Sequence, residues 1–139
     1  LELDTVPFTG HSASHTINGH SVVFRLTYGG FSYLFAGDLN DEASRHLTRE
    51  HNAGRLNLRS EMFKVPHHGS NTSSTADWLQ VVHPQLAVIE VGKDNTFGHP
   101  KPEILARYRD LGIPVLRTDL SGTIEVSSDG RRFWIVSAR

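Results

Sequence analysis

Cysteine is absent from the 139 residues of this chain. A disulfide framework and a thiolate metal site are therefore excluded, and the redox compartment stays undetermined. The sequence also lacks an apolar stretch long enough to cross a membrane, and it lacks a basic start followed by an apolar run. We therefore predict neither a transmembrane segment nor a signal peptide in this chain, and localisation stays open. The formal net charge of −1 gives no overall basic surface for nucleic acid.

What the chain does have is an ordinary globular composition and many histidines. Hydrophobic residues make up 37% and charged residues 21%, which suits a single domain with a real core. Nine histidines are unusual for this length. Imidazole is a common metal ligand and titrates near neutral pH, so the histidines are the first place to look for a site.

Hydrophobic periodicity predicts a β-hairpin, three alternations of strand and helix, and a second hairpin at the end of the chain. The Gly29-Gly30 pair is typical of a tight hairpin turn. Residues 1–20 are expected to be irregular. The predicted strands cover residues 21–28, 31–36, 62–66, 86–91, 115–118, 122–127 and 131–136. The predicted helices cover residues 41–51, a short segment with Trp78, Leu79 and Val82, and a segment from Pro102 with the stripe Ile104, Leu105, Tyr108 and Leu111.

The stretch from Glu61 to Ser70 organises the rest of the chain. An apolar strand ends at Pro66 and delivers His67 and His68 to its carboxyl edge, where layered α/β folds usually build their sites. Side chains alternate along a strand, so the two imidazoles should point to opposite sides unless the chain turns between them. The following Gly69 permits such a turn.

Further polar groups follow other predicted strands. They are Asp38, the loop from Asn95 to His99, and more weakly Thr118-Asp119. Because carboxyl ends of parallel strands share one edge, these groups should lie along one rim. A carboxylate with imidazoles suits Zn²⁺, Mn²⁺ or Fe²⁺, and Asp38 is the best candidate to bridge two metals.

Simpler interpretations stay open for several of these residues. Asp38 could be a turn or cap residue, Asn95 an ordinary turn residue, and His99 a loop imidazole before Pro100. A plain turn is preferred for Asp119. The hydroxyls at 70 and 72–74 are better helix caps than nucleophiles, because no G-x-S-x-G elbow is present. The histidines at positions 11, 15 and 20 match no familiar metal motif and favour a loop.

Four motifs taken together resemble the metallo-β-lactamase superfamily. They are NGHSVV at 18–23, LFAGD at 34–38, KVPHHGS at 64–70 and NTFGHP at 95–100. Within that superfamily the chain most resembles the hydrolase domain of ComEC-like bacterial competence proteins and their relatives. The resemblance covers roughly residues 18–127.

The resemblance implies a four-layer αββα sandwich with two divalent metals, Zn or Mn, at the edge between its halves. It implies Asp38 as the bridging ligand and His99 as a further metal ligand. One of His67 and His68 would bind metal while the other holds or protonates the substrate, with His67 preferred for the metal. Ser70 and Asn95 would contact the substrate.

The superfamily's first signature, H-x-H-x-D-H, does not occur in this chain. We therefore expect residues 1–139 to be the C-terminal half of such a domain, inactive alone, with the N-terminal half as its partner. The uncovered sheet face should then be apolar, with Val23, Phe24, Phe35 and Val88 as the residues of interest, depending on which face of the sheet each occupies. Glu90 is an odd residue for a buried strand.

These features predict a metal-dependent hydrolase of phosphodiesters, with nucleic acid as a possible substrate. Two alternatives remain. One is a hydrolase of small esters, lactones or thioesters on the same scaffold, which the fold cannot separate from the first. The other is a non-catalytic binding or scaffold module that has lost its metals.

Overall fold

The computed structural model describes residues 2–6 and 17–138. Its main feature is a six-stranded sheet whose strands lie side by side in their chain order, β1 to β6. The first three strands pair antiparallel and the last four pair parallel. The strands are β1 (Glu2–Val6), β2 (Val23–Tyr28), β3 (Phe31–Phe35), β4 (Met62–Lys64), β5 (Leu86–Ile89) and β6 (Val115–Arg117).

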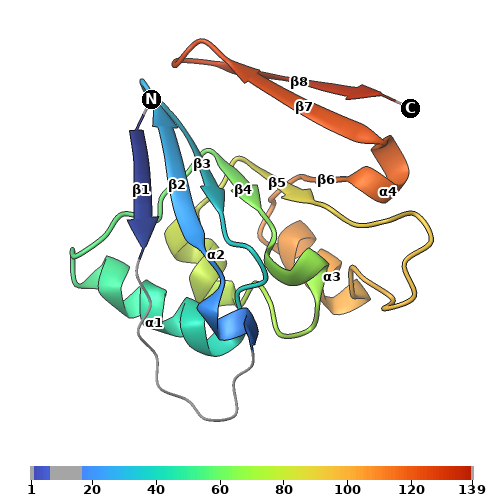
Figure 1. Cartoon of the computed structure of the whole chain (residues 1–139), viewed down its shortest axis with the longest axis horizontal. Helices are drawn as coiled ribbons and strands as arrows, with labels where there is room; N and C mark the ends of the chain where they lie inside the picture. The colour runs from blue at the N-terminus through green and yellow to red at the C-terminus, as the bar shows by residue number, and fades with distance from the viewer. Residues whose placement is uncertain (1, 7–16, 139) are drawn as a thin grey trace.

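Three helices connect the parallel strands, as the sequence predicts, and they cover one face of the sheet. They are α1 (Asp41–Asn52), α2 (Ala76–Val82) and α3 (Pro102–Asp110), and they lie below the strands in Figure 1. The side chains of Asn40 and Thr75 accept hydrogen bonds from backbone N–H groups in the first turns of α1 and α2. Trp78, Leu79 and Ile104 are buried with strand residues in one apolar core.

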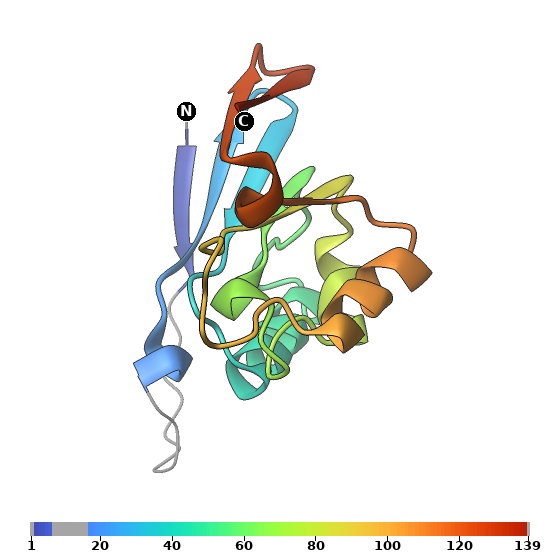
Figure 2. The same ribbon diagram turned by 90° about the vertical axis from the view of Figure 1, so that its right-hand side faces the viewer.

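A separate hairpin of β7 (Thr123–Ser128) and β8 (Phe133–Ala138) lies over the opposite face of the sheet (Figures 1 and 2). Its inner residues Ile124, Val126, Phe133 and Ile135 pack on a second apolar cluster of Phe31, Met62, Leu86 and Val88. The tip of the hairpin is held by the turn between β2 and β3, because Gly30 N donates to Gly130 O at 2.6 Å. The molecule is therefore a mixed α/β structure with helices on one face and a short hairpin on the other.

The hairpin covers only part of its face. Val23 and Val88 are buried, so neither of these two lines an uncovered surface. Phe24, Tyr33 and Phe35 stay partly exposed and stack on one another, with centroid distances of 4.7 Å between the two phenylalanines and 4.1 Å between Tyr33 and Phe35. Burial, followed by the charge of Glu90, raises the pKa of Tyr33. These three stacked rings form a partly uncovered aromatic surface on the sheet.

Four details differ from the sequence predictions. Residues 2–6, expected to be irregular, form the edge strand β1 against β2. The strand around Val88 ends at Ile89, so Glu90 is an exposed residue after it and not a buried strand residue. Leu111 lies beyond the end of α3 and is 41% exposed, so it is not part of the buried stripe. The expected turn after Thr118 is a single helical turn, α4 (Thr118–Ser121).

Within the described ranges, no helix combines the length and the apolar character that a membrane crossing needs.

Candidate functional site

The site lies where β3, β4 and β5 end. These neighbouring strands run parallel, so the segments that follow them emerge at one edge of the sheet. Asp38 follows β3, the His67-His68 pair follows β4, and the 92–99 loop follows β5. These groups therefore lie along one edge of the sheet, as the sequence predicted.

The two histidines lie in a turn after the strand, which is the alternative that the sequence left open. Both adopt left-handed backbone conformations, with φ of 48° at His67 and 53° at His68, inside a turn that runs from Pro66 to Gly69. His67 N donates to Gly37 O at 3.1 Å, and Ser70 N donates to His67 O at 2.9 Å. Left-handed conformations of residues other than glycine carry local strain of about 1–3 kcal/mol each and are concentrated at functional sites. The surrounding hydrogen bonds hold this strained pair in place.

His68 faces Asp38. The distance from His68 Nε2 to Asp38 Oδ1 is 3.5 Å, and both side chains are about 43% exposed. The other ring nitrogen, Nδ1, lies 2.6 Å from the carbonyl oxygen of Glu90. Because a carbonyl only accepts, Nδ1 carries the hydrogen, and in the neutral ring Nε2 presents its lone pair on the side of Asp38. A histidine fixed in this way through Nδ1 is typical of metal ligands.

His67 belongs to a second pair. Its ring lies 5.8 Å from the ring of His99, measured between centroids, at an interplanar angle of 68°. The amide nitrogen of Asn18 lies 3.4 Å from both ring nitrogens of His67. The sequence assigned no role to Asn18, and only its place in the NGHSVV motif could have drawn attention to it.

The loop that carries His99 is closed by the side chain of Asn95. His99 N donates to Asn95 Oδ1 at 2.9 Å, and Asn95 Nδ2 donates to His99 O at 2.9 Å. Nδ1 of His99 is buried without a hydrogen-bond partner among the described residues. Burial, and then the charges of Lys101, His67 and His68, lower the pKa of His99. Its neutral form is therefore favoured, as a lone-pair donor requires.

The loop after β4, which carries the two histidines, contacts the loop after β5, which carries His99, directly. Lys101 N donates to Gly69 O at 2.9 Å, and a Cβ added at Gly69 would lie 2.6 Å from the Cβ of Pro100. Because Gly69 has no side chain, the loop with the two histidines and the loop with His99 approach to contact. Thr118 supports the base of the loop that carries His99, because its hydroxyl accepts a hydrogen bond from Val91 N and donates one to Val91 O.

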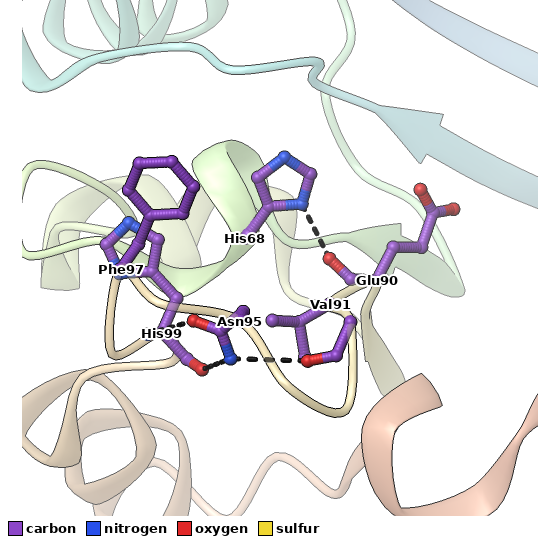
Figure 3. Close-up of a pocket in the computed structure, with 7 residues that line it drawn as sticks. His68, Glu90, Val91, Asn95, Phe97 and His99 are labelled. Carbon is purple, nitrogen blue, oxygen red and sulfur yellow. Dashed lines mark hydrogen bonds between the residues drawn. The ribbon is translucent and has the colours of Figure 1, made fainter.

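A hollow of about 370 Å³ opens between these loops (Figure 3). Its volume lies within the range of small-molecule sites. The lining residues are His68, Glu90, Val91, Gly92, Asn95, Phe97 and His99. Of these, Phe97 received no role from the sequence.

The remaining predicted residues take varied positions. Asn95 lines the hollow, and its amide is engaged with His99. Ser70 is 3% exposed, lies outside the lining, and its hydroxyl is 3.2 Å from that of Thr72. Asp119 pairs with Arg117, in keeping with a structural role. His11 and His15 fall outside the described residues, and His20 is exposed.

The donors fit a divalent metal in kind, but the described part of the chain offers too few in one place. A carboxylate and imidazoles are suitable ligands for Zn²⁺ or Mn²⁺. Among residues 2–6 and 17–138, no group of three or more His, Asp or Glu side chains is arranged to hold a metal ion. The site consists of two pairs, Asp38 with His68 and His67 with His99.

Comparison with known proteins relates the chain to bacterial competence proteins. It is 40% identical over 108 residues to "Competence protein ComA" of Neisseria gonorrhoeae, an alignment that covers 78% of this chain and 15% of the relative. It is 34% identical over 108 residues to "ComE operon protein 3" of Bacillus subtilis, covering 78% and 13%. It is 30% identical over 122 residues to "Recombination protein 2" of Haemophilus influenzae, covering 88% and 15%.

The chain thus spans only 13 to 15% of the length of these three relatives. No protein-family model matches it.

Proposed function

We propose that this relative of the competence proteins is the C-terminal half of a metallo-β-lactamase-like domain that hydrolyses phosphodiesters. The observation that carries the proposal is the approach of His68 Nε2 to Asp38 Oδ1 at 3.5 Å, with Nδ1 of the same ring fixed by Glu90 O. The names of the relatives support nucleic acid as the substrate, because competence and recombination are processes in which DNA is handled.

In this proposal Asp38 and His68 are the metal ligands that this chain supplies. The further ligands that a complete site needs would come from the N-terminal half of the domain. A bound metal of this kind supplies a water of lowered pKa as the nucleophile. The Glu90 carbonyl keeps Nδ1 of His68 protonated, so the other ring nitrogen stays directed to the ligand side.

His67 and His99 would act on the substrate side of the site. His67 is held between Asn18 and His99, which fixes its ring next to a residue that lines the hollow. Its imidazole would hold the scissile phosphate or give a proton to the leaving oxygen. Acid–base groups of this kind typically contribute about 10²–10⁴-fold to the rate. This assignment exchanges the roles that sequence reasoning preferred for His67 and His68, because His68 is the ring that faces Asp38.

The test uses the complete gene product and measures metal content beside hydrolysis of bis(p-nitrophenyl) phosphate and of single-stranded DNA. We expect Asp38→Asn and His68→Ala to lose metal and activity together. We expect His67→Ala and His99→Ala to retain metal with a rate about 10²–10⁴-fold lower. His83→Asn is the matched control, because His83 is an exposed histidine beyond α2, and asparagine tolerates its left-handed φ of 48°.

Other outcomes would separate the alternatives. Loss of metal in His99→Ala would make His99 a ligand, as the resemblance to the superfamily implies. Hydrolysis of lactones or thioesters without hydrolysis of phosphodiesters would favour the ester hydrolase. If all four variants keep both metal and rate, the histidines are structural and the proposed function is wrong.

A further inference from the structure

Phe97 is an apolar side chain in an unusual place. It is 76% exposed and lines the hollow together with His68 and His99. The loop around it is rich in polar residues, and Phe97 belongs to neither apolar core of the described residues. An exposed aromatic ring beside a candidate site is available to contact a bound ligand.

The loop holds the ring in a defined position. Lys101 Nζ donates to the carbonyl oxygen of Phe97 at 3.1 Å, and the amide of Asn95 closes the loop on the backbone of His99. The Phe97 ring stacks on the imidazole of His99 with a centroid distance of 6.1 Å and an interplanar angle of 18°. The ring is therefore exposed on a braced loop, in a fixed relation to a residue of the site.

The position of the ring connects it to the proposed chemistry. Figure 3 shows Phe97 beside the ring of His99 and across from His68. A flat group resting on Phe97 would thus occupy the same hollow as His68, whose Nε2 faces Asp38. The ring offers a large π face and no hydrogen-bonding group, so it recognises planarity and not the pattern of polar atoms at an edge.

We propose that Phe97 is a stacking platform for a nucleobase of a single-stranded nucleic acid. The inference rests on the proposed function and adds that the nucleic-acid substrate is single-stranded. Bases in a duplex have both faces covered by their neighbours, whereas a single strand can present an open face to an aromatic side chain. Stacking of this kind tolerates every base, because each base has a π face. It also contributes affinity that does not depend on a basic surface, in agreement with the net charge of −1.

The experiment measures binding by fluorescence anisotropy with the complete gene product and EDTA present, so that binding is observed without turnover. The probes are a labelled oligothymidylate and an oligomer of the same length whose sugars lack bases. We expect Phe97→Ala to weaken binding of the oligothymidylate by about 5- to 150-fold and to leave the abasic oligomer unchanged. Phe97→Tyr should restore binding, and Leu111→Ala, an exposed apolar change beyond α3, should have no effect.

Three results would overturn the inference. The wild type could bind both probes equally, it could bind neither, or Phe97→Ala could lose the same affinity for both probes. Hydrolysis with metal restored is then measured on the same two probes. Base-dependent binding without any hydrolysis would contradict the proposed function and leave the stacking role intact. Hydrolysis that is insensitive to Phe97→Ala, together with unchanged binding, would contradict the stacking role and leave the proposed function intact.

Discussion

The contact between Gly69 and Pro100 joins the two loops of the site, and it can be tested by one methyl group. Gly69 has φ of +81°, and an added Cβ would lie 2.6 Å from Pro100 Cβ and 3.2 Å from its Cα. In Gly69→Ala the left-handed conformation costs about 1–2 kcal/mol. Forcing the loops apart adds about 1–3 kcal/mol, as overpacking does elsewhere. The expected loss in the free energy of unfolding is therefore about 2–5 kcal/mol.

Gly54→Ala separates the two contributions. Gly54 has a similar φ of +70°, but a Cβ there would meet nothing within 4 Å. This variant should lose only the conformational part, about 1–2 kcal/mol. Urea denaturation of both variants gives the two values, and their difference of about 1–3 kcal/mol measures the loop contact. Equal losses in Gly69→Ala and Gly54→Ala would refute the claim that close packing on Pro100 requires glycine at position 69.

Three further predictions concern the loop of His99 and the sheet face. Asn95→Asp cannot donate to His99 O, so the catalytic rate should fall while cooperative unfolding persists. An unchanged rate would show that this hydrogen bond is not needed to position His99. The pKa of His99 should lie below its usual value of about 6.5 by NMR titration and should rise in Lys101→Met. Because the folded state favours the neutral ring, the stability linked to His99 is present above about pH 6.5 and is lost as pH falls through the lowered pKa. Residues 1–139 expressed alone should bind a hydrophobic dye through the partly exposed rings of Phe24 and Phe35, and a monomer that binds none would count against a missing half.

Much of the fold follows from sequence periodicity. The β2–β3 hairpin, the cap at Asn40, and the start of α3 at Pro102 are all local signals, and the structure has each of them. Strand β1 escaped prediction although Glu2 and Asp4 alternate with leucines in the period of a strand, because the polar residues that follow favoured an irregular segment. Glu90 was misjudged because periodicity cannot show the residue at which a strand ends.

The candidate site could be located from the sequence, but its internal arrangement could not. The ends of parallel strands indicated where Asp38, His68 and His99 would gather. The pairing of His68 with Asp38 depends on two consecutive left-handed residues, which are uncommon outside glycine even though histidine tolerates this conformation better than most residues. The exposure of Phe97 likewise depends on how Asn95 closes the loop, which is a tertiary property of side-chain hydrogen bonds.

The order of strands in the sheet has a consequence for synthesis on the ribosome. Each strand from β2 to β6 pairs with the one that precedes it in the chain, so every new strand finds its neighbour already made. This order suits folding during translation, in which the N-terminal part of a chain forms first. The exception is the final hairpin, whose Gly130 must return to Gly30 at the beginning of the sheet. The rim with Asp38, His68 and His99 should therefore form on the nascent chain before the hairpin docks. A chain that lacks β7 and β8 should still form this rim, but Met62 and Val88, which the hairpin covers, should be exposed to solvent.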